Sequence, residues 1–135
     1  AGSLSEQLAA DCDDEPVAAM LIAGEDDLLV PYEGGDLGGG WTGGLFGNMR
    51  SMPSSAQFWA DHAECGDAST VEVDDKDDDT ALETRTYADC THPVVLHTIK
   101  GGGHTWPGAR HIPGLGAVSD ELDASEAIWA FFEGL

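Results

Sequence analysis

Basic residues are scarce in this 135-residue chain, which has five Lys and Arg against 26 Asp and Glu. The formal net charge is -21 at pH 7, so the protein repels phosphate backbones and anionic lipid headgroups. We therefore expect neither a nucleic acid nor a membrane as its partner. Such acidity is typical of a solvated surface whose self-repulsion is screened by high salt, as in salt-adapted proteins.

Long apolar runs are also missing, since no stretch approaches the roughly 18 to 20 apolar residues that cross a bilayer. A basic segment followed by an apolar one, the pattern of a secretory signal, is absent. His-x-x-x-His spacings do not occur either, so the histidines predict no metal site, and nothing in the sequence indicates a cofactor. The chain begins Ala-Gly-Ser rather than with Met, which suggests a processed product or a fragment.

Residues 74–79 are almost all acidic and invite a calcium interpretation, which the spacing does not support. An EF-hand loop that begins at Asp75 would have Thr80 where glycine is required and Thr86 where glutamate is required. We interpret the run as the solvated tip of a β-hairpin. A weak cation site is the alternative.

Three cysteines leave at least one of them unpaired in any arrangement within the chain. Cys65 closes a predicted helix and Cys90 follows a predicted strand, so the two bracket the acidic hairpin. In an oxidising compartment we expect a disulfide between them, which would stabilise the fold by roughly 3 kcal/mol. Cys12 would then be free, or bonded to something outside this chain.

Two continuous apolar runs, residues 17–23 and 94–99, predict parallel strands that are covered on both faces. Residues 70–73 and 81–87 alternate in polarity and predict the strands of the acidic hairpin. The sequence therefore indicates an α/β fold.

Three helices are expected, the first a short turn at residues 5–10. The second begins after the N-cap Ser51 and ends before Gly66. The third follows Asp123, which forms a capping box with Glu126. Its apolar residues recur at helical spacing, and we expect this stripe to pack on the sheet. The stripe consists of Ile128, Phe131, Phe132 and Leu135.

The most informative segment is Gly-Gly-Gly-His-Thr-Trp-Pro-Gly at residues 101–108, directly after the second apolar run. It places His104 on a loop at the carboxyl end of a buried strand, where catalytic groups are common. The first apolar run leads to Asp26 and Asp27 at the same edge of the sheet. An acid followed by a histidine base is the second half of a Ser–Asp–His order, although the pattern does not choose between the two aspartates.

The nucleophile that this order requires is missing, because no Gly-x-Ser-x-Gly motif occurs in the chain. Ser51, Ser54 and Ser55 offer hydroxyls, but none of them lies at a strand-to-helix turn between glycines. The remaining histidines lack the strand–glycine setting, and we expect them at the surface or in packing. They are His62, His92, His97 and His111.

Two tryptophans are candidates for the substrate side of such a site. Trp106 follows His104 closely, and Trp41 lies in a segment, residues 34–47, that contains eight glycines. Glycine loses much backbone freedom on ordering, so this segment predicts a loop. The loop would either contact a substrate or serve as a plain connection.

Two segments of the chain resemble the polyhydroxybutyrate depolymerase and feruloyl esterase family of α/β-hydrolases. They are residues 23–35, Ala-Gly-Glu-Asp-Asp-Leu-Leu-Val-Pro-Tyr-Glu-Gly-Gly, and the residues 101–108 given above. The corresponding family segments are His-Gly-Thr-x-Asp-x-x-Val-Pro-Tyr-x-Gly-Gly and Gly-Gly-His-Thr-Trp-Pro-Gly. Further matches at residues 51–59, 87–90 and 122–132 extend the resemblance over nearly the whole chain.

The resemblance implies that residues 1–135 form the C-terminal half of an α/β-hydrolase domain. Parallel strands would be flanked by helices, and the acidic β-hairpin would be an excursion from them. Asp27 takes the place of the triad acid and His104 that of the base. Cys65 and Cys90 match a disulfide of the family, whose members are commonly secreted. The serine elbow and the oxyanion-hole loop would lie upstream of residue 1.

Two functions are consistent with these features. The first is a secreted, salt-adapted serine esterase that acts on polyhydroxyalkanoates or on feruloyl or acetyl-xylan-type esters. This chain would supply Asp27 and His104, pair with the missing N-terminal half and be inactive alone. The alternative is a naturally truncated, non-catalytic module for binding or assembly, which would self-associate or pair through an exposed sheet edge.

Overall fold

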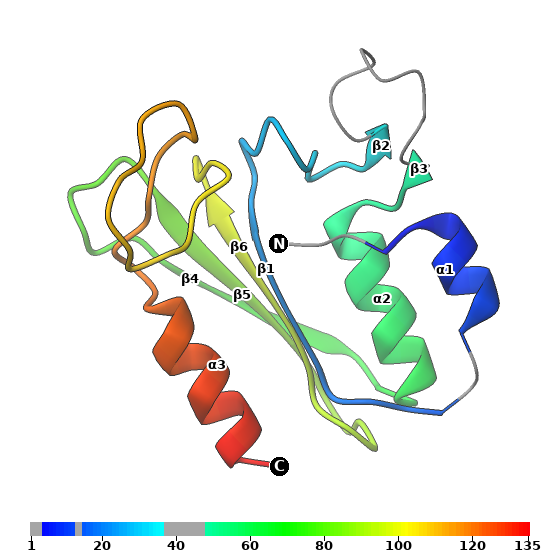
Figure 1. The fold of residues 1–135 in the computed structure, drawn as a ribbon. Coiled ribbons are helices and arrows are strands. Elements are labelled where there is room, and N and C mark those ends of the chain that lie inside the picture. The colour runs from blue at the N-terminus through cyan, green and yellow to red at the C-terminus, as the bar shows by residue number, and fades with distance from the viewer. Residues whose placement is uncertain (1–3, 13–14, 37–47) are drawn as a thin grey trace.

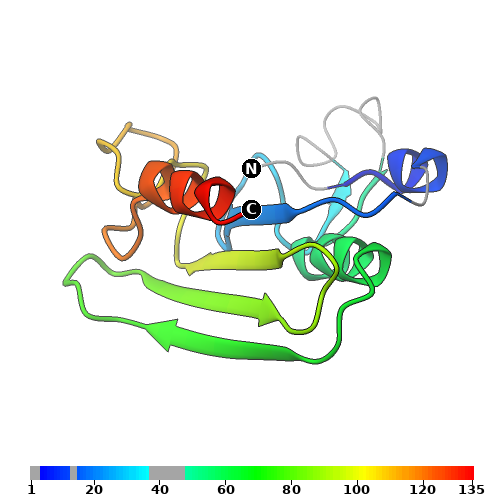
Figure 2. The ribbon, with the colours of Figure 1, turned by 90° about the horizontal axis from the view of Figure 1, so that it is seen from below.

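The chain folds into a four-stranded mixed sheet with helices on both faces, as shown by a computed structural model that describes residues 4–12, 15–36 and 48–135 (Figure 1). The strand order is β1 (Ala19–Gly24), β6 (Val94–Lys100), β5 (Ala81–Tyr87) and β4 (Ala68–Val73), as Figure 2 shows. The helices are α1 (Glu6–Asp11), α2 (Met52–His62) and α3 (Ala124–Glu133). A short separate ribbon joins β2 (Gly35–Asp36) to β3 (Asn48–Met49).

The two predicted apolar strands, β1 and β6, pair in parallel in the centre of Figure 1, from Ala19 opposite Val94 to Gly24 opposite Ile99. The acidic hairpin differs from the expectation, because it is no excursion. Its strand β5 pairs antiparallel with β6, so the hairpin extends the same sheet. Leu82 and Tyr87 of β5 are buried in this arrangement, and the burial of their apolar surface stabilises the pairing of the hairpin with the sheet.

Both predicted helix caps are formed. The Ser51 hydroxyl accepts a hydrogen bond from the Ser54 N–H (3.2 Å), and α2 begins directly after it. The Asp123 carboxylate accepts from the N–H groups of Ser125 and Glu126 (2.9 and 3.0 Å) at the start of α3. These side chains satisfy donors that have no partner in the first helical turn.

The core lies between α2 and one face of the sheet. Its most deeply buried members are Met52, Ala56, Ala60, Ala63, Val94 and Leu96. The predicted disulfide between Cys65 and Cys90 packs against this core and links the chain after α2 to the chain after β5. Cys12 is exposed and free.

The apolar stripe of α3 packs on the sheet only in part, so this expectation was wrong for half of its residues. Ile128 and Phe131 are partly buried, but Phe132 is 59% and Leu135 64% exposed. The reason is position: α3 lies beside β1, the last strand of the sheet, and its far side extends past the sheet edge (Figure 2). None of the helices in the described ranges is long and apolar enough to cross a membrane.

The tip of the acidic hairpin is bonded to the loop that precedes α3. Backbone N–H groups of Asp75 and Lys76 donate to the Glu121 carboxylate (2.9 and 2.6 Å), and the Asp120 N–H donates to Asp78 (2.6 Å). Hydrogen bonds from Asp120 and Thr80 lower the pKa of Asp78. Within the described part of the chain, no three acidic, His or Cys side chains are grouped to hold a metal ion.

His97 is packed inside the protein. The sequence analysis expected the remaining histidines either at the surface or in packing, and His97 is of the second kind. It is 8% exposed, and its Nδ1 lies 2.9 Å from the Thr84 hydroxyl on the neighbouring strand. Burial lowers the pKa of His97 below its usual range, because the charged imidazolium loses its hydration. By contrast, His92 and His111 are exposed.

His97 predicts that acid weakens the fold. Its folded pKa is lowered, so between that pKa and about 6.5 the unfolded chain binds the proton more tightly than the folded chain does. The free energy of unfolding should fall as the pH drops through this window, by at most about 1.4 kcal/mol per pH unit for one proton. Urea unfolding from pH 7.5 to 5 should show a flatter dependence for His97→Gln than for the wild type. The exposed control His92→Gln should leave the slope unchanged, and equal slopes for all three proteins would contradict the prediction.

Candidate active site

The residues that follow β1 are hydrogen-bonded to the end of β6 and to the loop after it, at the carboxyl ends of the two strands. The Glu25 N–H donates to the Ile99 carbonyl and the Asp26 N–H to the Gly102 carbonyl, both at 2.9 Å. Gly24 allows this approach, since a side chain on it would collide with the carbonyl oxygens of Gly102 and Gly103. Residues that follow two separate strands are thereby held against one another.

Asp27 is buried at this junction and held in a single orientation. It is 6% exposed, and its Oδ1 accepts hydrogen bonds from the N–H groups of Leu29 and Val30, both at 2.8 Å. Its Oδ2 lies 2.8 Å from Nδ1 of His104. Asp26 is exposed and does not contact His104 through its carboxylate. The structure therefore brings together Asp27 and His104, the two residues that the sequence analysis paired.

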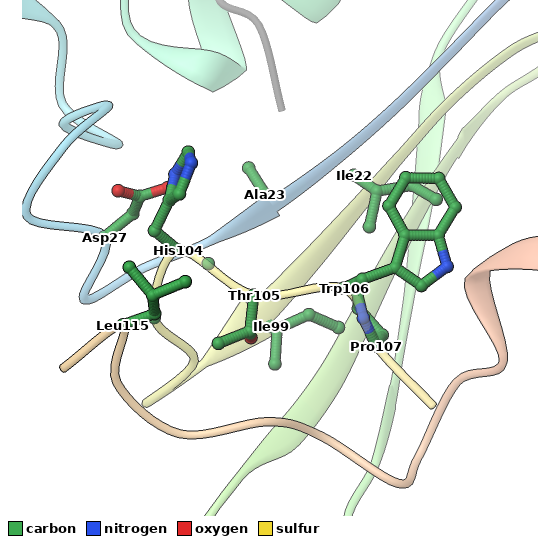
Figure 3. A pocket seen from close by; sticks show the side chains of 11 residues that line it. Ile22, Ala23, Asp27, Ile99, His104, Thr105, Trp106, Pro107 and Leu115 are labelled. Atoms are coloured by element: carbon green, nitrogen blue, oxygen red, sulfur yellow. The ribbon is translucent and has the colours of Figure 1, made fainter. Parts of the chain in front are cut away.

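The hydrogen bond determines the tautomer of His104. An ionised carboxylate only accepts, so Nδ1 carries the proton and Nε2 is left as an acceptor. No residue of the described ranges donates to Nε2. The imidazole is 36% exposed and faces a cavity of about 280 Å³ (Figure 3). A neutral imidazole with a buried acid behind it and an open Nε2 is suited to accept a proton from a bound reactant.

The cavity beside His104 has a mixed lining, with apolar side chains beside the polar Asp27, His104 and Thr105. Its lining includes Ile22, Ala23, Ile99, Trp106, Pro107 and Leu115. Trp106 lies at the opposite end of the cavity from the Asp27–His104 pair in Figure 3, is 51% exposed and donates from Nε1 to the Ser125 hydroxyl (3.2 Å). Trp41, the other substrate-side candidate, lies outside the described residues.

The described lining of this cavity contains no serine or cysteine. Its one hydroxyl belongs to Thr105, which donates to the Ala117 carbonyl at 2.8 Å. The serines near the start of α2 have structural roles: Ser51 caps the helix, and the buried Ser55 hydroxyl donates to the Ser51 carbonyl (2.9 Å). Ser54 lies in the first turn of the same helix. Among the residues that the structure describes, the arrangement is therefore an acid–base pair with no serine or cysteine beside it.

Residues 115–117 position His104, although sequence reasoning did not identify them. The Gly103 N–H donates to the Ala117 carbonyl (3.0 Å), and a Cβ on Gly103 would lie 2.6 Å from the Cα of Gly116. A Cβ there would collide still more closely with the Leu115 carbonyl oxygen. In the sequence, Gly103 and Gly116 were the available signs of a close backbone contact. A glycine alone does not reveal which distant backbone it contacts.

Asp27→Asn should change the tautomer of His104. An amide both donates and accepts, so the neutral imidazole would no longer be held with its proton on Nδ1. Long-range proton–nitrogen NMR correlations of the histidine rings, recorded where His104 is neutral, should show one tautomer in the wild type and a mixture in the variant. Asp26→Asn, which alters the neighbouring exposed carboxylate, should keep the wild-type spectrum. A mixed tautomer in the wild type itself would refute the prediction.

Gly103→Ala should displace the loop that carries His104, because the new methyl group meets backbone atoms that cannot rotate away. Overpacking of this kind costs about 1 to 3 kcal/mol. Urea unfolding should show that loss, together with an altered His104 ring signal. Gly66→Ala is the matched control, since the nearest atom to its Cβ would lie at 3.6 Å and its stability should change little. Equal stability of the two variants would contradict the packing described above.

Compared with protein-family models, curated proteins and solved structures, the chain matches none of them.

Proposed function

We propose that this chain carries the acid and the base of a Ser-His-Asp carboxylic-ester hydrolase and forms the C-terminal half of an α/β-hydrolase domain. The observation that supports this most strongly is the 2.8 Å hydrogen bond between Asp27 and His104. The two side chains come from the carboxyl ends of adjacent parallel strands, β1 and β6, and they have the relation of acid to base in a catalytic triad.

In the proposed reaction Nε2 of His104 removes the proton of a serine hydroxyl while the serine oxygen attacks the ester carbonyl. Asp27 stabilises the imidazolium that forms and keeps its ring in place. The imidazolium then gives the proton to the departing alkoxide, which leaves an acyl-serine. In the second half, His104 activates water in the same way and the acid is released. The serine and the oxyanion donors are supplied by residues outside this sequence.

The substrate proposal rests on the cavity and on the resemblance of the sequence motifs. Apolar side chains such as Ile22, Ile99 and Trp106 suit the acyl or aromatic part of an ester better than a charged group. Polyesters and aromatic-acid esters are the proposed substrates. The Cys65–Cys90 disulfide supports a secreted enzyme, because such bonds persist in oxidising compartments. The large negative charge suits a salty medium.

Hydrolysis of p-nitrophenyl butyrate tests the proposal. The chain alone should hydrolyse it no faster than buffer, and a polypeptide extended upstream to include a Gly-x-Ser-x-Gly segment should be active. In the extended protein, His104→Ala should lower kcat by roughly 10³-fold or more, because the serine loses its base. His92→Ala, an exposed histidine, should keep full activity. Equal activity of the chain alone and the extended protein, or an active His104→Ala, would overturn the proposal. An inactive extended protein would also overturn it and leave the non-catalytic alternative.

A further inference from the structure

The tip of the acidic hairpin lies against residues 119–121, shortly before α3 (Figure 1). One contact is made by the Asp78 carboxylate. Its Oδ2 accepts a hydrogen bond from the Asp120 N–H (2.6 Å), and its Oδ1 accepts from the Thr80 N–H (2.9 Å). Asp78 therefore bonds to both segments, whereas the exposed Asp77 beside it has no hydrogen-bond partner in the described part of the chain.

A second contact between the same two segments is buried. Thr80 is 5% exposed and Ser119 is fully buried, and their hydroxyl oxygens lie 2.7 Å apart. The Thr80 hydroxyl also lies 2.7 Å from Oδ1 of Asp78. A buried hydroxyl that loses its partner is costly, so these bonds limit how far the hairpin tip and residues 119–121 can move apart.

Residues 117–119 bond in turn to the loop after β6. The Ser119 carbonyl accepts a hydrogen bond from the Gly108 N–H (2.8 Å), and the Ala117 carbonyl accepts one from the Gly103 N–H (3.0 Å). Ser119 thus contacts the hairpin tip through its hydroxyl and the loop after β6 through its carbonyl. A single residue joins the two.

The hairpin tip also contacts the start of this loop directly. A Cβ on Gly101, the first residue after β6, would lie 2.9 Å from the Asp79 carbonyl oxygen. Gly101 has a φ of +69°, which glycine adopts readily. The loop that carries His104 is therefore held by the tip at Gly101 and, through Ser119, again at Gly108.

We propose that Asp78, Thr80 and Ser119 are positioning residues. They hold the loop after β6 so that His104 stays within hydrogen-bond distance of Asp27 and keeps its Nε2 open to the cavity. Both partners of every bond in this series lie in the described chain. The value of the arrangement for ester hydrolysis rests on the proposed function, whereas its hold on the loop does not.

Hydrogen exchange of the backbone amides tests the proposal in the nitrogen-15-labelled chain. Asp78→Ala should free the Asp120 amide and should also speed exchange of the Gly103 and Gly108 amides by about tenfold, because the segment that carries their acceptors is released. Asp77→Ala removes the same charge from the same tip and should leave these amides unchanged. Wild-type exchange at Gly103 and Gly108 in Asp78→Ala would overturn the proposal, since the tip would then be attached to its neighbour without holding the loop.

Two variants of Thr80 keep the test decisive if Asp78→Ala does not fold. Thr80→Val removes the hydroxyl beside Ser119, so it should speed exchange of the same two glycine amides and shift the ring signals of His104. Thr80→Ser keeps the hydroxyl and should restore wild-type exchange and ring signals. Wild-type ring signals of His104 in Thr80→Val would refute the positioning role, because a purely structural bond would leave them unmoved.

Kinetics of the extended protein separate this proposal from the proposed function. Asp78→Ala should lower kcat for p-nitrophenyl butyrate about tenfold with little change in KM, because a displaced base impairs proton transfer more than binding. Asp77→Ala should keep the wild-type kcat. A wild-type kcat in Asp78→Ala would overturn the positioning role. An extended protein without activity would overturn the esterase instead, and the exchange measurements would still decide whether these residues hold the His104 loop.

Discussion

The parallel pairing of β1 with β6 aligns the carboxyl ends of two strands that lie far apart in the sequence. Asp27 follows one strand and His104 the other, so residues separated by 77 positions meet at one edge of the sheet. An antiparallel pairing of the same strands would have placed them at opposite ends. The candidate site and the cavity beside it both follow from this single ladder.

Close contacts between backbone segments fix the loops after β1 and β6 so that Asp27 and His104 lie within hydrogen-bond distance of each other. Gly24 lies under the loop after β6, and Gly103 lies against residues 115–116, with no room for a Cβ at either position. The Ala117 carbonyl accepts bonds from Gly103 and Thr105 on both sides of His104. The loop that carries His104 is therefore held by two other segments of the chain, the end of β1 and residues 115–117.

Features encoded by nearby residues could be predicted from the sequence. The caps at Ser51 and Asp123 and the buried strands are of this kind, because capping hydrogen bonds and continuous apolar runs are local. The choice of Asp27 over Asp26 needed a resemblance or a structure, since it depends on which carboxylate faces inward. The exposure of Phe132 could not be predicted, because helical spacing shows that a stripe exists and not how much of the sheet lies beneath it.

The bonds around Ala117 make the position of His104 depend on a later part of the chain. The Ala117 carbonyl accepts hydrogen bonds from Gly103 and Thr105, the residues on either side of His104. The Asp27–His104 pair therefore lies among residues from three regions of the sequence: the turn after β1, the loop after β6 and residues 115–117. A substitution that moves residues 115–117 would change the position of His104 without touching its imidazole.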